Sequence, residues 1–146
     1  KPRIVRTVAA LRRETAAWRI NGHTYAVVPT MGALHDGHLA LVAEGLKRAD
    51  RIITTIFVNP KQFAANEDLS RYPRDEDGDI RKLARAGTHL IFAPPPGEVY
   101  RDGFATTVSL AGPAKAGLED KFRPQFFDGV TTIDEVVRET VMEDLD

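Results

Sequence analysis

The chain has 146 residues, of which 42% are hydrophobic and 28% are charged, with a formal net charge of -1 at pH 7. These values predict one globular domain, residues 1–146, and exclude the basic excess that is typical of nucleic-acid-binding proteins. Cysteine is absent, which excludes disulfides, thiolate nucleophiles and cysteine-based zinc sites. No apolar run is long enough to span a membrane and no signal-like segment opens the chain, so we expect a cytoplasmic protein.

The hydrophobic pattern predicts strands that alternate with helices. Apolar residues recur every three or four positions in the expected helices, and β-branched runs mark the expected strands. This order predicts an α/β fold, a Rossmann-like parallel sheet with flanking helices. The expected strands are 24–28, 52–58 and 89–93, and the expected helices are 7–19, 37–50 and 75–86, with Gly87 as the stop of the third helix. The expected inward-facing residues are Val8, Leu11, Thr15, Trp18, Leu39, Val42, Ala43, Leu46, Ile80, Leu83 and Ala84.

The last third of the chain has a less regular pattern. A further strand is expected at 106–110, followed by a segment at 111–127 that is interrupted by Gly and Pro. Thr132 and Glu135 have the spacing of a capping box, which predicts the start of a last, acidic helix. Its expected apolar stripe is Ile133, Val137, Val141 and Leu145.

The stretch 27–38 is the strongest functional signal, because a buried strand stops there and a helix begins. His35 and His38 lie three residues apart, with Gly37 between them. A helix start offers unpaired backbone N–H groups and the positive end of a dipole, so we expect it to bind a phosphate. In parallel sheets, ligands bind outside the carboxyl ends of the strands, where both this loop and the loop 59–63 are expected.

Two other interpretations of the histidines stay open. The side chains could simply cap the helix, or they could share a zinc ion, since they are spaced i and i+3. Asp36 is the sole further zinc ligand nearby, and the Pro-Thr-Met-Gly sequence after a strand favours the phosphate site. Gly37 is expected to let a nucleotide approach the backbone.

An acidic cluster opens the third expected helix. Its members are Asp75, Glu76, Asp77 and Asp79. Negative charge is favourable at a helix N-terminus, so we expect a solvated helix start and not a metal site.

Three motifs follow one another along the chain. They are Pro29-Thr30-Met31-Gly32-Ala33-Leu34-His35-Asp36-Gly37-His38, Ile56-Phe57-Val58-Asn59-Pro60-Lys61-Gln62-Phe63 and Asp68-Leu69-Ser70-Arg71-Tyr72-Pro73-Arg74. In order and spacing they resemble the pantothenate synthetase (pantoate-β-alanine ligase) family over about residues 1–130. The His-x-Gly-His element also resembles the wider nucleotidyltransferase superfamily.

The resemblance implies a two-step ligation in a homodimer. Pantoate and ATP, accompanied by Mg²⁺, form pantoyl adenylate and pyrophosphate, and the amine of β-alanine then displaces AMP. His38 is implied as the catalytic proton donor, Gln62 as a pantoate ligand and Asn59 as a support of the same pocket. The implied ATP-binding loop is Met31, Gly32, Ala33, Leu34, His35, Asp36, Gly37 and His38.

The chain also departs from the family pattern. Gln125-Phe126 stand where a histidine commonly precedes the Phe-x-Gly segment, and the Gly-Glu-Lys-Asp and Met-Ser-Ser-Arg segments do not occur. We therefore expect the chain to lack the C-terminal lid domain, with 131–146 as an atypical acidic helix. Three hypotheses remain: the ligase, a nucleotide-binding remnant without catalysis, and another His-x-Gly-His nucleotidyltransferase.

Overall fold

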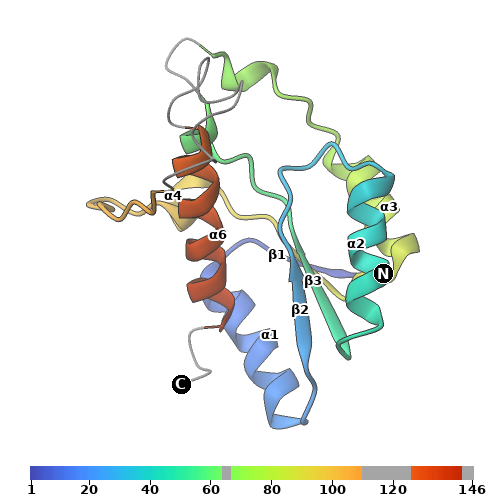
Figure 1. Cartoon of the computed structure of the whole chain (residues 1–146). Coiled ribbons are helices and arrows are strands. Elements are labelled where there is room, and N and C mark those ends of the chain that lie inside the picture. The colour runs from blue at the N-terminus through green and yellow to red at the C-terminus, as the bar shows by residue number, and fades with distance from the viewer. Residues whose placement is uncertain (64–66, 110–125, 143–146) are drawn as a thin grey trace.

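The computed structural model describes residues 1–63, 67–109 and 126–142, and the sheet in this part of the chain is fully parallel (Figure 1). Its strand order is β1-β4-β3-β2. The strands are β1 (Arg3–Val5), β2 (Tyr25–Val28), β3 (Arg51–Thr55) and β4 (Leu90–Phe92). The α-helices are α1 (Val8–Ile20), α2 (Asp36–Leu46), α3 (Glu76–Ala86), α4 (Pro96–Val99) and α6 (Phe126–Met142), and the 3₁₀ turns are η1 (Pro60–Gln62) and η2 (Leu69–Arg71).

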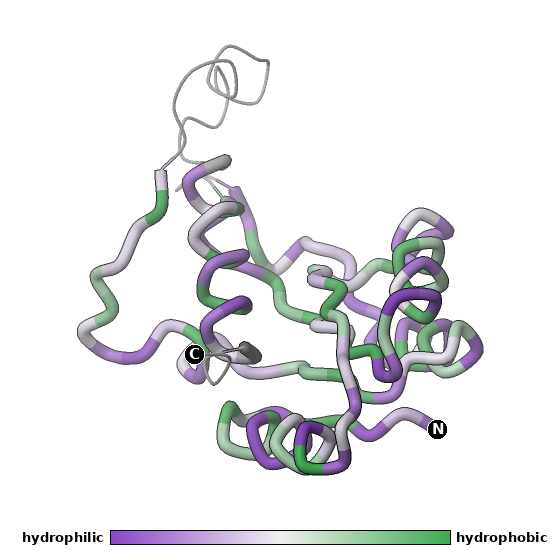
Figure 2. The backbone as a smooth tube through the Cα atoms, turned by 60° about the horizontal axis from the view of Figure 1, so that its bottom comes forward, coloured by the Kyte–Doolittle hydropathy of each residue, from purple (hydrophilic) through white to green (hydrophobic). Residues whose placement is uncertain are grey.

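The sheet lies between two layers of helices. Helices α2 and α3 cover one face, and α1 and α6 lie along the other (Figure 1). Apolar strand segments run through the middle of the molecule, while the helices alternate between polar and apolar residues (Figure 2). The predicted α/β class with a parallel sheet is therefore confirmed.

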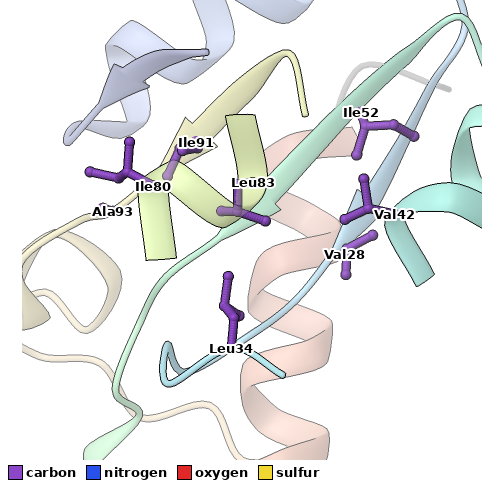
Figure 3. Close-up of a cluster of buried hydrophobic side chains, with 8 residues drawn as sticks. All are labelled: Val28, Leu34, Val42, Ile52, Ile80, Leu83, Ile91 and Ala93. Atoms are coloured by element: carbon purple, nitrogen blue, oxygen red, sulfur yellow. The ribbon is translucent and has the colours of Figure 1, made fainter. Parts of the chain in front are cut away.

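Each face of the sheet has its own core, because successive strand residues point to opposite sides. Ile52 and Ile91 pack with residues of α2 and α3, as Figure 3 shows. The neighbouring Ile53, Leu90 and Phe92 pack on the α1 side. Burying one such side chain stabilises the fold by about 1.5–3 kcal/mol, so the two cores fix which face each helix covers.

Several predicted elements occur where the sequence pattern placed them. Val8, Leu11 and Thr15 are buried on α1, and Ile80 and Leu83 are buried on α3. Gly87 ends α3 in the left-handed conformation with a φ of 96°, as its predicted role as a stop requires.

Other expectations about the elements are wrong. Strand β1 was not predicted, since three residues show no clear period. Strand β3 ends at Thr55 and not at 58, because the next two N–H groups, of Ile56 and Phe57, bond to the end of β4 and to the loop after β2. Helix α2 ends at Leu46 instead of about 50. Three residues expected to face inward are exposed instead: Ala43, Leu46 and Ala84.

The C-terminal part also differs from expectation. Residues 106–109 form no strand, and helix α6 begins at Phe126, six residues before Thr132. The Thr132 side chain is 1% exposed and contacts the backbone of Val108, so it joins two segments and does not cap a helix. Of the irregular segment predicted at 111–127, the last two residues begin α6, and residues 111–125 lie outside the described residues, as does Leu145. Among the described residues, no helix is both long enough and apolar enough to cross a membrane.

Helix α6 approaches the loop after β3 closely at Gly129. A β-carbon at Gly129 would lie 2.3 Å from the carbonyl oxygen of Lys61. The Gly129 carbonyl also accepts a hydrogen bond of 2.9 Å from Asn59 Nδ2. Glycine is therefore required for α6 to lie against η1.

We predict that Gly129→Ala lowers the free energy of unfolding by about 2 kcal/mol, since an extra carbon in a tight contact costs about 1–3 kcal/mol. Urea unfolding followed by circular dichroism measures it. Gly97→Ala is the matched control, because a β-carbon there meets nothing within 4 Å. Equal stability of the two variants would contradict the close packing of α6.

Candidate nucleotide and carboxylate site

The loop between β2 and α2 is tied to the end of β3 through Thr30. The Thr30 hydroxyl donates to the carbonyl of Thr55 at 2.6 Å and accepts from Gly32 N at 3.2 Å. The Thr30 carbonyl accepts from Phe57 N at 3.0 Å. These bonds fix where the chain leaves the sheet.

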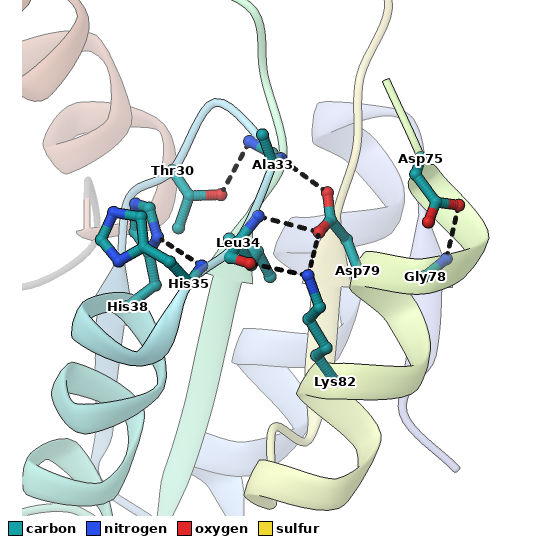
Figure 4. Close-up of polar contacts among 10 residues, drawn as sticks. Thr30, Ala33, Leu34, His35, His38, Asp75, Gly78, Asp79 and Lys82 are labelled. Atoms are coloured by element: carbon teal, nitrogen blue, oxygen red, sulfur yellow. Dashed lines mark hydrogen bonds and ion pairs between the residues drawn. The ribbon is translucent and has the colours of Figure 1, made fainter. Parts of the chain in front are cut away.

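Asp79 on α3 holds the other side of this loop. Its carboxylate accepts hydrogen bonds from Ala33 N at 2.8 Å and from Leu34 N at 2.9 Å, and Lys82 Nζ donates to the Leu34 carbonyl at 2.7 Å (Figure 4). Asp79 is only 2% exposed. The expectation that the whole acidic cluster is solvated is therefore wrong for Asp79, because its charge is used to order the loop.

The loop needs this support because its backbone is unusual. Gly32 and Ala33 have φ angles of 80° and 51°. A β-carbon at Gly32 would lie 3.1 Å from the nearer Asp79 oxygen. A non-glycine residue in the left-handed region is strained. The two hydrogen bonds that Asp79 accepts from Ala33 N and Leu34 N therefore stabilise a backbone conformation that is intrinsically unfavourable for Ala33.

The two imidazoles cap the start of α2. His35 Nδ1 accepts from Gly37 N at 3.1 Å, and His38 Nδ1 accepts from His35 N at 3.3 Å. Their ring centroids are 4.0 Å apart. A β-carbon at Gly37 would lie 2.9 Å from the His35 ring, so in this structure the glycine makes room for the cap.

This capping changes which groups can meet an anion. Many N–H groups of the loop are already bonded within the protein, so the expectation of unpaired backbone donors is wrong for Gly32, Ala33, Leu34, His35, Gly37 and His38. Because both Nδ1 atoms accept, each neutral ring carries its proton on Nε2. On these two rings, the Nε2–H groups are therefore the donors that the cap leaves for an anion.

Burial lowers the pKa of His38, with a further lowering from neighbouring His35 and an opposing effect of Asp79. The ring is accordingly neutral at pH 7, which keeps Nδ1 as an acceptor and Nε2–H as a donor.

Residues from both predicted loops line one cavity of about 240 Å³. His38 and Thr30 of the first motif and Gln62 of the second contribute polar groups, and Met31, Phe57 and Ile133 contribute apolar surface. Asp134 of α6 adds a carboxyl group whose pKa is raised by burial. The structure thus brings together His38 and Gln62, which the sequence placed in separate motifs.

The other predicted site residues have different positions. Met31 and Gly32 line the cavity, whereas the Leu34 side chain is 3% exposed and lies in the core. Asn59 is 0% exposed, and its Nδ2 donates a hydrogen bond to Gln62 Oε1. The residues with exposed side chains at the loop surface are Ala33, His35 and Asp36. Gln125 lies outside the described residues.

A larger cavity of about 480 Å³ lies on the other side of Met31, Gly32 and Phe57, which line both. Arg6 and Glu76 form an ion pair in its wall. Across the described ranges, no cluster of three or more His, Cys, Asp or Glu could hold a metal ion.

Comparison with known proteins identifies the family. The family model described as pantoate-beta-alanine ligase matches residues 3–141. The chain belongs to this family. A pantothenate synthetase of Paramagnetospirillum magneticum is 55% identical over 130 residues, which are 89% of this chain and 45% of that protein. One of Caulobacter vibrioides is 54% identical over 132 residues, 90% of this chain and 46% of that protein.

Solved structures of the family have the same fold. A pantothenate synthetase of Thermus thermophilus has a TM-score of 0.85 at 42% identity, and the match covers 95% of this chain and 49% of that protein. A Francisella tularensis pantoate-beta-alanine ligase, complexed with beta-gamma ATP and beta-alanine, has a TM-score of 0.87 at 30% identity, with 97% of this chain and 54% of that protein covered. The chain spans about half the length of the relatives it matches. The family resemblance of the three motifs is confirmed.

We predict that Asp79→Asn lowers the free energy of unfolding by about 2 kcal/mol, because an NH₂ group then faces a buried backbone N–H. Amide hydrogen exchange at Ala33 and Leu34 should accelerate roughly tenfold or more. Asp77→Asn, at an exposed position of the same helix, is the control and should change neither quantity. Unchanged exchange at both amides would contradict the role of Asp79.

We also predict that His38 titrates below its ordinary pKa of 6.5. Because the folded-state pKa is depressed, the unfolded chain binds the proton more readily, so this residue's contribution to stability falls as the pH drops below about 6.5. Proton NMR of the ring measures the value. In Asp79→Asn the pKa of His38 should fall further, since the carboxylate that raises it is lost. A His38 pKa above 6.5 in the unsubstituted protein would contradict this prediction.

Proposed function

We propose that this chain forms the nucleotide- and pantoate-binding part of an ATP-dependent pantoate-β-alanine ligase. The observation that carries the proposal is that His38 and Gln62, from two of the family's motifs, line one small cavity. Family membership supports the reaction, and the ligands of the Francisella tularensis relative support ATP and β-alanine. A homodimer and a cytoplasmic location stay predictions.

In the first step, a carboxylate oxygen of pantoate attacks the α-phosphorus of ATP. The bond between the α- and β-phosphates breaks, and pantoyl adenylate and pyrophosphate form. Negative charge grows on the leaving oxygen, and a donor that meets it there lowers the barrier. His38 fits this role because its neutral ring presents Nε2–H, and the adjacent His35 offers a second donor of the same kind.

In the second step, the amine of β-alanine attacks the acyl carbon of the adenylate. The bond from this carbon to the AMP oxygen breaks, an amide forms, and the nitrogen loses a proton to the phosphate of the departing AMP. An acyl adenylate hydrolyses in water, so the pocket must exclude water. Met31, Phe57, Val130 and Ile133 supply apolar surface for this purpose.

Gln62 is proposed to recognise the carboxylic acid. Its Oε1 accepts a hydrogen bond of 2.9 Å from Asn59, so its NH₂ group is the half that can donate into the cavity. A cavity of about 240 Å³ suits a small acid rather than a drug-sized ligand, whose pockets measure about 300–1,000 Å³.

Magnesium is proposed to come with the nucleotide. The described residues provide no cluster of acidic and histidine ligands, and Mg²⁺ commonly binds through substrate phosphates and water. When bound, the ion neutralises phosphate charge and so favours departure of pyrophosphate.

A second candidate function is nucleotide binding without ligation. Asp134 favours it, because this carboxyl group lines the cavity in which another carboxylate is proposed to bind. Like charges at close range disfavour binding. Calorimetry separates these two functions. ATP binding together with pantoate binding and pyrophosphate release supports the ligase, whereas ATP binding alone supports a nucleotide-binding protein without ligation.

We predict opposite effects of two nearly isosteric substitutions on pantoate affinity. Gln62→Glu replaces the donor by a second negative group and should weaken binding about 100-fold, since loss of a hydrogen bond to a charged group and the new repulsion each cost about 1.5 kcal/mol or more. Asp134→Asn removes a negative charge and should tighten binding. Calorimetric titration measures both.

Affinity for ATP is the internal control in both variants and should change by less than about threefold, a difference below 1 kcal/mol. Pantoate affinity that is equal in Gln62→Glu and Asp134→Asn would rule out this cavity as the carboxylate site.

A further inference from the structure

Asn59 links three segments that are far apart in the sequence. Its Nδ2 donates to Gln62 Oε1 and to the Gly129 carbonyl, both at 2.9 Å. Its Oδ1 accepts from Lys61 N at 3.2 Å and from the Tyr100 hydroxyl at 2.7 Å. Both protons and both lone pairs of this fully buried amide are therefore used within the protein.

The partners of Asn59 fix the direction of its amide. A backbone N–H can only donate and a backbone carbonyl can only accept, so Oδ1 must face Lys61 and Nδ2 must face Gly129. Nδ2 then meets Gln62 as a donor, and Gln62 must turn its own oxygen toward Asn59. The NH₂ group of Gln62 is thereby left for the cavity that Gln62 lines.

Tyr100 makes the shortest of these four hydrogen bonds. Burial raises the pKa of Tyr100 to about 12, so its hydroxyl stays protonated and donates. The ring packs 5.0 Å from Phe104 and 6.0 Å from Phe57, and Lys61 Nζ lies 4.8 Å from its centroid. The donor is therefore held on a ring with restricted freedom.

We infer that Tyr100 is a positioning residue, which acts through Asn59 to keep the NH₂ group of Gln62 directed into the small cavity. The identity of the ligand that this NH₂ group binds rests on the proposed function, in which Gln62 donates to an acceptor oxygen of pantoate. Tyr100 thus contributes to selection of a carboxylate without touching it. Without the hydroxyl, Asn59 Oδ1 keeps only the longer bond from Lys61 N, and both amides gain freedom to tilt.

The first measurement needs no substrate. In ¹H-¹⁵N spectra, the Gln62 side-chain amide is assigned by its loss in Gln62→Ala. Tyr100→Phe should shift these signals and speed their exchange with solvent several-fold. Tyr25→Phe is the matched control, because Tyr25 starts β2 beside Trp18, away from the loops that follow the strands. Unmoved Gln62 signals in Tyr100→Phe would overturn the inference.

The second measurement is a double-mutant cycle on pantoate affinity. Tyr100→Phe alone should weaken binding about fivefold to tenfold, as expected for one buried hydrogen bond. In a Gln62→Ala background the same change should have almost no effect, because the residue it positions is gone. A purely structural role predicts equal losses in both backgrounds, and that result would also overturn the inference.

Failure of the proposed function gives a different result. If the unsubstituted chain binds no pantoate but Tyr100→Phe still moves the Gln62 signals, the positioning role stands and the assigned substrate is wrong. If pantoate binds and the Gln62 signals stay unmoved, the substrate stands and the positioning role is wrong.

Discussion

Two backbone N–H groups donate to the buried carboxylate of Asp79, and the geometry of the site depends on this contact. The bonds hold Ala33 and Leu34 in place, although Ala33 has a positive φ. Leu34 then enters the core, and the next residue, His35, starts helix α2 as its cap. A charge that is 2% exposed is costly to bury, and hydrogen bonds to ionised groups are strong enough to compensate. The stability of α3 is therefore coupled to the shape of the loop between β2 and α2.

The part of the small cavity that Gln62 lines depends on Asn59 in a comparable way. Its amide joins η1 to α6 through Gly129 and to Tyr100 beyond α4. Two loops that contribute residues to the cavity are thus each held by one buried polar side chain, Asp79 or Asn59, that contacts groups from distant segments. Such networks rigidify a site when every member is satisfied, so the donors of His38 and Gln62 are held in place before any ligand arrives.

The sequence predicted what is local and missed what is long-range. The strand-helix order, the Gly87 stop and the two motif loops follow from periodicity and turn chemistry, and they are found in the structure. The burial of Asp79 could not be predicted, because a helix start with four acidic residues indicates a solvated surface and its partners lie 45 and 46 positions away. Tyr100 gave no signal for the same reason, since its bond to Asn59 spans 41 positions. The strand expected at 106–110 failed because Val108 pairs with threonine hydroxyls of α6 and not with a strand.

The central claim is that the loop held by Asp79, with its two imidazoles, receives the phosphates of ATP. The most direct test is a titration of the chain with ATP, followed residue by residue through backbone and histidine-ring NMR signals. The account predicts that the largest shifts fall on residues 32–38, with the His35 and His38 ring signals moving together. Shifts confined to the larger cavity around Arg6 and Glu76, with both rings unmoved, would contradict it.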